Sequence, residues 1–152
     1  MTRKTLILLA TGGSAALLLG AFGFQFLGYA PCKMCLWQRW PHGAAVLVGA
    51  LAMLLPFAIL PLFGALAAAT TGAIGVYHTG VEQKWWQGPT TCTSGDIGGM
   101  STQDLFDQIM AAPLVRCYEI AWQLLGLSMA GWNALISFAL MAIWIIAARA
   151  KA

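Results

Sequence analysis

Apolar residues in this chain form three long tracts that no charged side chain interrupts. The tracts lie between Lys4 and Lys33, between Arg39 and Glu82, and between Glu119 and Arg149. Each tract is long enough to cross the hydrocarbon core of a bilayer as a helix. The pattern therefore predicts membrane-spanning helices rather than a water-soluble core.

The middle tract is too long for a single span. Its roughly 42 residues would make a helix of about 63 Å, about twice the thickness of the bilayer core. Pro56 and Pro61 give the strongest turn signal inside it and divide it into two helices. We therefore expect an all-α membrane protein, a bundle of four transmembrane helices in a single domain over residues 1–152, with spans near 6–28, 41–57, 61–80 and 129–148. The outer loops, 29–40 and 81–128, then carry the cysteines.

The first tract has an alternative interpretation as a cleaved signal peptide, because Arg3 and Lys4 precede the apolar run. The run is longer than the apolar region of a typical signal peptide, and no clear small-residue cleavage site follows it. We therefore expect a retained span.

Composition agrees with a membrane protein, since 60% of the 152 residues are hydrophobic and only 9% are charged. All five acidic residues lie between Glu82 and Glu119, which marks this stretch as a solvated loop. Ser101 resembles a helix cap, and apolar residues follow it at helical spacing up to Pro113, so we expect a short helix there. Whether this helix lies on the membrane surface or packs on the loop stays open. No nucleic-acid partner is expected.

The positions of the basic residues predict how the chain is oriented in the membrane. The two loops and the two termini carry equal numbers of Lys and Arg, but the terminal charges sit in short tails, at Arg3, Lys4, Arg149 and Lys151. This density favours both termini in the cytoplasm, with both loops facing outward. Tryptophans near the expected ends of the spans, Trp144 at the inner end among them, are typical of an interfacial aromatic belt.

The candidate chemistry rests on four cysteines, one pair in each outer loop. Cys32 and Cys35 form a C-x-x-C motif, a spacing that lets two sulfurs bond across a tight turn and is compatible with a lowered thiol pKa. Cys92 and Cys117 are far apart, so a purely structural disulfide between them, stabilising by about 3 kcal/mol, is one alternative. A zinc site is another, but only one pair has the short spacing common in such sites, and we expect no metal. Leu36 excludes the haem-attachment signature.

Redox exchange is favoured over a purely structural role of the disulfides for a physical reason. The C-x-x-C ring is too small to stabilise much, whereas two disulfides at one membrane face can exchange through thiolate attack. Arg39, four residues after Cys35, is either an interface anchor or a cation that stabilises a thiolate and binds a quinone oxygen. His78, at the outer end of the third expected span, is a second polar candidate, although a structural role is common for such a histidine.

Two further residues shape the expected start of the second span. Pro41 prefers the first turn of a helix, so we expect regular helix to begin near Trp40. His42 follows directly, and an interface position is preferred for it over contact with a quinone.

The chain resembles the bacterial disulfide bond formation protein B family (DsbB) along nearly its whole length. The matching residues are Pro31-Cys32-x-x-Cys35 followed by Gln38-Arg39, Tyr77-His78-Thr79, the distant pair Cys92 and Cys117, and Cys117-x-Glu119-x-x-Trp122-x-x-Leu125-Gly126-Leu127-x-Met129. This combination is far more specific than C-x-x-C alone.

The resemblance implies an inner-membrane enzyme that oxidises a periplasmic thioredoxin-fold oxidase of the DsbA type and reduces ubiquinone or menaquinone. It implies that Cys92 takes the partner's thiolate and that Cys117 then attacks Cys32. Cys35 is left as the thiolate that faces the quinone, and Arg39 and His78 line the quinone site.

Two alternatives stay open at this stage. One is a dedicated relative that oxidises a specialised thioredoxin-like partner. The other is a membrane scaffold with four spans and two structural disulfides, which would resist reduction by glutathione.

Overall fold

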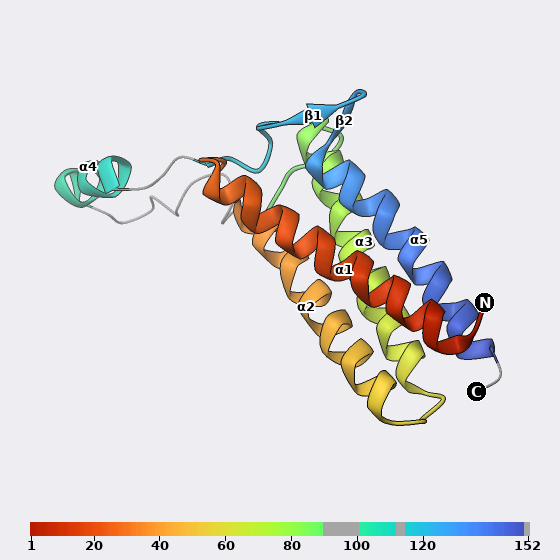
Figure 1. Ribbon diagram of the computed structural model, residues 1–152. Helices are drawn as coiled ribbons and strands as arrows, with labels where there is room; N and C mark the ends of the chain where they lie inside the picture. The colour runs from red at the N-terminus through yellow and green to blue at the C-terminus, as the bar shows by residue number, and fades with distance from the viewer. Residues whose placement is uncertain (90–100, 112–114, 151–152) are drawn as a thin grey trace.

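The computed structural model describes residues 1–89, 101–111 and 115–150. Its elements are α1 (Arg3–Phe26), α2 (Lys33–Leu54), α3 (Leu60–Glu82), α4 (Thr102–Ala111), β1 (Gln123–Leu124), β2 (Leu127–Ser128) and α5 (Met129–Arg149). The four long helices form an up-and-down bundle, in which α1 and α3 each pack against both α2 and α5 (Figure 1). Helices α1, α3 and α5 lie where the apolar tracts predicted them, whereas α2 begins earlier than expected.

The bundle has two chemically different ends. Figure 1 shows the start of α1, the connection from α2 to α3 and the end of α5 at one end. The start of α2, the end of α3 and the hairpin of β1 and β2 lie at the other end, while α4 stands apart from the bundle. Cys32, Cys35 and His78 belong to this second end.

Short polar side chains and prolines set most helix ends. The Thr2 side chain accepts a hydrogen bond from the Thr5 amide at the start of α1, and Ser128 accepts one from Gly131 at the start of α5. Pro61 stands in the first turn of α3, where its missing amide hydrogen costs nothing. The predicted turn between Pro56 and Pro61 is therefore confirmed.

The start of α2 differs from the expectation. The helix begins at Lys33, two turns before Pro41, which lies inside it. Cys32 caps this end, because its Sγ accepts a hydrogen bond from the Cys35 amide at 3.2 Å. The predicted start near Trp40 is therefore wrong, and most of the expected loop 29–40 is helical. Cys35 and Arg39 consequently stand one turn apart on the same helix.

Three of the long helices, α1, α3 and α5, are long and apolar enough to cross a membrane. Large apolar side chains point outward from the bundle, such as Leu19, Leu47 and Leu66, which are 71%, 68% and 64% exposed. Such a surface suits contact with lipid rather than water. In α2 the polar residues Arg39 and His42 lower the apolar character of the first turns, and the fourth span at 41–57 stays a prediction.

Trp144 lies in the core rather than at an interface. Its side chain is fully buried together with Ile7 of α1 and Leu140 of α5. A Cβ atom at Gly64 of α3 would lie only 2.6 Å from the Trp144 ring, so the glycine makes room for the indole. The aromatic-belt interpretation is therefore wrong for Trp144, and α3 and α5 meet through a small residue, as is common between membrane helices.

The described part of the expected long loop 81–128 contains two short structures, α4 and the hairpin of β1 and β2. The short helix predicted after Ser101 is confirmed as α4, but the side chains of Leu105 and Ile109 on its expected apolar face lie outside the described residues. Strand β1 pairs antiparallel with β2 through Leu125 and Gly126, whose φ angles of 52° and 80° are both left-handed. This is the backbone of a tight hairpin turn, and leucine gives little signal for it in the sequence.

Candidate functional site

The C-x-x-C cysteines form a close dithiol at the start of α2. Their Sγ atoms are 2.7 Å apart, and both cysteines are free. A disulfide needs about 2.05 Å between the sulfurs, so only a small movement separates them from bonding distance, and an oxidant that takes two electrons would then form the bond. Cys32 is buried and Cys35 is half-buried, which leaves Cys35 the more accessible of the two.

The two thiols are chemically unequal. The hydrogen bond to Cys35, together with burial, raises the pKa of the Cys32 thiol above its ordinary value. Cys35 lies in the first helical turn, where the positive end of the helix dipole favours a thiolate. Cys32 is therefore the proton donor within the pair, and Cys35 is the readier thiolate.

His78 joins this pair to the second cysteine loop. Its Nε2 atom lies 3.5 Å from Cys32 Sγ and 3.2 Å from the backbone oxygen of Cys117. Cys117 is disulfide-bonded, only 1% exposed, and packed in one buried cluster with Cys32, Met34 and Val81. The structure thus brings together Cys32, Cys35, His78 and Cys117, whereas Cys92 lies outside the described residues.

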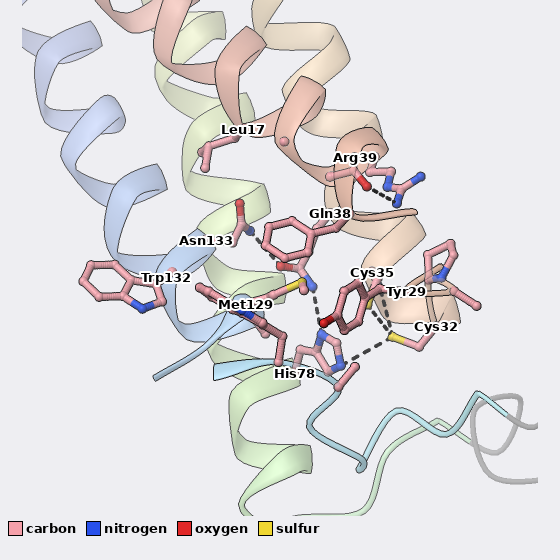
Figure 2. Close-up of a pocket in the computed structure, with 18 of the residues that line it drawn as sticks. Leu17, Tyr29, Cys32, Cys35, Gln38, Arg39, His78, Met129, Trp132 and Asn133 are labelled. Carbon is pink, nitrogen blue, oxygen red and sulfur yellow. Dashed lines mark hydrogen bonds between the residues drawn. The ribbon is translucent and has the colours of Figure 1, made fainter. Parts of the chain in front are cut away.

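A row of buried polar side chains, joined by hydrogen bonds, fixes the orientation of the His78 ring. Gln38 Nε2 donates to His78 Nδ1 at 2.9 Å, and Asn133 Nδ2 of α5 donates to Gln38 Oε1 at 2.7 Å. His42 Nε2 then donates to Asn133 Oδ1 at 2.8 Å. Figure 2 shows Asn133, Gln38, His78 and Cys32 joined in sequence by dashed lines. Because Nδ1 accepts from Gln38, the ring proton of neutral His78 sits on Nε2 and faces the sulfur and the carbonyl.

Sequence reasoning missed part of this row. Gln38 and Asn133 were not site candidates, and the interface position preferred for His42 is wrong, because its side chain is 3% exposed and bonded to Asn133. The available signal was polarity within otherwise apolar helices. Buried polar side chains in membrane helices are costly, so they mark sites more often than chance.

Gln38 gives a direct test of this row. A Gln38→Leu change leaves His78 Nδ1 without its donor and removes one acceptor of Asn133 Nδ2, which keeps its bonds to Thr71. We therefore expect the free energy of unfolding to fall by about 1–3 kcal/mol. Chemical denaturation in detergent micelles measures it. The matched control is Gln83→Leu, because Gln83 is exposed at the end of α3. Equal effects of the two changes would contradict a role for Gln38 in the row.

Arg39 faces α1 rather than the sulfurs. Its guanidinium donates to Gln25 Oε1 at 2.6 Å and to the Ala21 carbonyl at 3.1 Å, and it lies 4.9 Å from the centre of the Phe22 ring. Its Nε atom is buried and has no hydrogen-bond partner among the residues that the structure describes. Arg39 thus connects α2 to α1 through hydrogen bonds, and its Nε–H group is left as a donor for another partner.

A cavity of about 370 Å³ adjoins these groups. Cys35, Arg39 and His78 all line it, as do Gln38 and His42. The rest of its wall is mostly apolar, with contributions from Leu17, Ala21, Phe24, Met129 and Trp132. Its size lies in the range of small-molecule sites, and a largely apolar ligand with a few polar atoms suits such a lining.

Comparison with known proteins finds a family and relatives that match nearly the whole chain. Residues 3–147 match the family model described as disulfide bond formation protein DsbB. The chain is 32% identical to disulfide bond formation protein B of Azoarcus sp. (strain BH72), over 97% of this chain and 94% of the relative. It is 30% identical to the protein of that name from Verminephrobacter eiseniae (strain EF01-2), over 98% of this chain and 86% of the relative. No solved structure matches the chain.

The family match covers both the cysteine motif and the helices that position it. A buried dithiol, a disulfide-bonded cysteine beside it and a histidine that contacts both are suited to thiol-disulfide exchange. The chain therefore belongs to the disulfide bond formation protein B family, as a membrane protein with disulfide oxidoreductase chemistry.

Proposed function

We propose that this chain reoxidises a periplasmic thioredoxin-fold oxidase of the DsbA type and passes the electrons to a membrane quinone, either ubiquinone or menaquinone. The observation that carries the proposal is the packing of Cys32, at the start of α2, against Cys117 of the second cysteine loop. Cys32 shares a buried cluster with the disulfide-bonded Cys117, and His78 Nε2 reaches both residues. Disulfides brought this close exchange readily once one of them is attacked by a thiolate.

The proposed relay starts at the exposed loop. The partner's thiolate attacks Cys92, which forms a mixed disulfide and releases Cys117 as a thiolate. Cys117 attacks Cys32, breaking the bond between Cys32 and Cys35 and releasing Cys35 as a thiolate. Each exchange breaks one disulfide and forms one, so the partner's two electrons move toward Cys35 without loss.

The remaining steps re-form the disulfide between Cys92 and Cys117. The partner's other thiolate attacks the mixed disulfide, and the partner leaves oxidised while Cys92 becomes free. Cys92 then attacks the bond between Cys117 and Cys32, which reforms the pair of Cys92 and Cys117. Cys32 and Cys35 are left as the dithiol, the form with two free sulfurs found here.

His78 and the first turn of α2 stabilise negative charge on the sulfurs of Cys32 and Cys35. The Nε2 proton of His78 points at Cys32 Sγ and at the Cys117 carbonyl, so it can stabilise charge on Cys32 as it is attacked or leaves. Gln38 holds the imidazole in that tautomer. The first turn of α2 stabilises the Cys35 thiolate, which favours its role as the leaving group.

The cavity fits a quinone head group. Its wall is mostly apolar, Cys35 and His78 line it, and Arg39 brings a hydrogen-bond donor to the same space. A bound quinone supplies the oxidising power, since it accepts two electrons and two protons. Arg39 Nε, which has no partner among the described residues, would donate to a quinone oxygen, and the surrounding apolar side chains would exclude water.

We further propose four spans in a bacterial inner membrane, with both termini cytoplasmic and the cysteines periplasmic. The start of α1 and the end of α5 lie at one end of the bundle, and the dithiol lies at the other (Figure 1). Arg3, Lys4 and Arg149 belong to the first end, which agrees with the excess of positive charge usual on the cytoplasmic side. Helix α2 packs against α1 and α3, which are both apolar enough to span, and this supports α2 as the fourth span.

The relay is tested by leaving only two cysteines in the chain. In a Cys35→Ser, Cys92→Ser double variant we expect mild oxidation to link Cys32 to Cys117, because these residues share one buried cluster. The control is a Cys32→Ser, Cys92→Ser double variant, which retains Cys35 and Cys117. We expect its bond to form at least about tenfold more slowly, because Cys32 belongs to the buried cluster of Cys117, whereas Cys35 only packs against that cluster. Alkylation followed by peptide mass mapping measures both rates, and equal rates would contradict the order of the relay.

A further inference from the structure

A histidine stands beside the C-x-x-C pair within reach of a shared metal ion. Cys32 Sγ, Cys35 Sγ and His78 Nε2 all lie within 4.8 Å of one another. The sulfurs come from the start of α2 and the imidazole from the end of α3, and Figure 2 shows His78 and the two cysteines turned toward one another. Two thiolates and an imidazole are ligands that zinc and other thiophilic divalent cations prefer.

Two of these atoms already have the separation that a tetrahedral ion requires. Zn–S bonds of about 2.3 Å and Zn–N bonds of about 2.05 Å put sulfur and nitrogen about 3.6 Å apart on a tetrahedral ion. Cys32 Sγ lies 3.5 Å from His78 Nε2. Two sulfur ligands need about 3.8 Å between them, whereas the cysteine sulfurs here are 2.7 Å apart. Cys35 must therefore withdraw by about 1 Å, which a change in its χ1 angle provides.

Charge balance also favours a divalent cation at this place. Two thiolates neutralise the two positive charges of the ion, so the complex adds no net charge to a buried site. The Oε1 atom of Glu82 lies 3.8 Å from His78 Nε2, and its other carboxylate oxygen accepts a hydrogen bond from Ser128. Glu82 is thus held beside His78, where a movement of its carboxylate would bring it to the ion as a fourth ligand.

The neighbours of His78 suit a metal ligand. Metal-binding histidines are usually held at the other ring nitrogen by a second hydrogen bond, and Gln38 holds His78 Nδ1 in this way at 2.9 Å. With a cation on Nε2, the ring proton moves to Nδ1. The Gln38 amide can turn to accept this proton through its oxygen, provided that the Asn133 amide, which donates to that oxygen in the metal-free state, turns with it.

We propose that the reduced Cys32 and Cys35 pair and His78 form a redox-gated site for zinc or a similar thiophilic divalent cation. Binding releases one proton from each thiol and forms two metal–sulfur bonds. Oxidation to the disulfide removes both sulfur ligands, so metal binding and disulfide formation exclude each other. A bound cation therefore keeps the pair reduced and stops turnover. The spacing of the cysteines along the chain could not reveal this site, because the third ligand comes from another helix.

Cobalt(II) tests the site without any quinone or protein partner, so the result does not depend on the proposed function. The protein is the full chain in detergent, reduced, with Cys92→Ser and Cys117→Ser so that Cys32 and Cys35 are its only thiols. We expect one cobalt ion per chain, with thiolate charge-transfer absorption in the near ultraviolet and the visible bands of a tetrahedral ion. Zinc should displace the cobalt, and the oxidised protein should show no bands.

The decisive variant is His78→Phe in the same background. We expect cobalt affinity to fall at least about tenfold, with altered visible bands, because one ligand is lost. The matched control is Trp40→Phe, since Trp40 is an exposed aromatic residue at the same end of the bundle and lies outside the ligand group. Circular dichroism checks the fold, and His78→Gln replaces His78→Phe if the latter does not fold. Absence of bands in the reduced protein, or unchanged affinity after loss of His78, would overturn the proposal.

Discussion

Changing Cys35 to serine is expected to reduce electron transfer from a reduced thioredoxin-fold partner to a soluble quinone to the level measured without protein. A hydroxyl cannot form the disulfide with Cys32 that accepts the electrons of Cys117, nor can it serve as the thiolate at the cavity. The loss of quinone absorbance in the ultraviolet measures turnover. The matched control is Lys33→Gln, because Lys33 is an exposed residue of the same motif. Full turnover in the Cys35→Ser protein would contradict the relay.

The same variant separates the two halves of the reaction. The exchange at Cys92 and Cys117 does not involve Cys35, so we expect the variant to oxidise no more than one equivalent of partner and then stop. Trapping of free thiols with an alkylating reagent, followed by mass measurement, counts the partner oxidised. Continuing oxidation of the partner beyond one equivalent would show that electrons leave by another route.

The largest expected effect on stability comes from Trp144. A Trp144→Ala change should lower the free energy of unfolding by about 3–5 kcal/mol, because it opens a cavity between α3 and α5. Trp144 is 0% exposed, and Gly64 leaves no other side chain to fill the space. Denaturation in detergent micelles, followed by helix content, measures the change.

The matched control for this prediction is Trp40→Ala. Trp40 is 80% exposed at the dithiol end of the bundle, so its removal leaves no cavity and should change stability by about 0.5 kcal/mol or less. Similar losses in the two variants would contradict the placement of Trp144 in the core.

The long helices could be predicted because their signals are local. Uncharged length reveals a membrane helix directly, and Pro56 and Pro61 mark the only sharp turn of the middle tract. The start of α2 was misplaced because the preference of Pro41 for a first turn was weighed without the cap that Cys32 provides. One proline inside a helix removes one amide donor, and packing against α1 and α3 can compensate for it.

Contacts between helices were harder to predict than the helices themselves. A helix that is apolar on all sides gives no periodic signal for which face turns inward. For this reason Trp144 was expected at an interface, and the row from His42 through Asn133 to Gln38 was missed. The C-x-x-C cysteines could be singled out as candidates because their spacing alone reveals the motif. Their closeness to His78 and Cys117 follows from the packing of α2 on α3, which the sequence does not show.

The central proposal is the transfer of electrons from a protein dithiol to a quinone through this chain. The most direct test is quinone reduction by the detergent-purified protein, followed by ultraviolet absorbance, with a reduced thioredoxin-fold oxidase as donor. We expect one quinone reduced for each partner oxidised, over many turnovers and only when both substrates are present. If the partner stays reduced and the quinone stays oxidised, the chain is not a quinone-dependent thiol oxidase, and a membrane scaffold with structural disulfides becomes the better description.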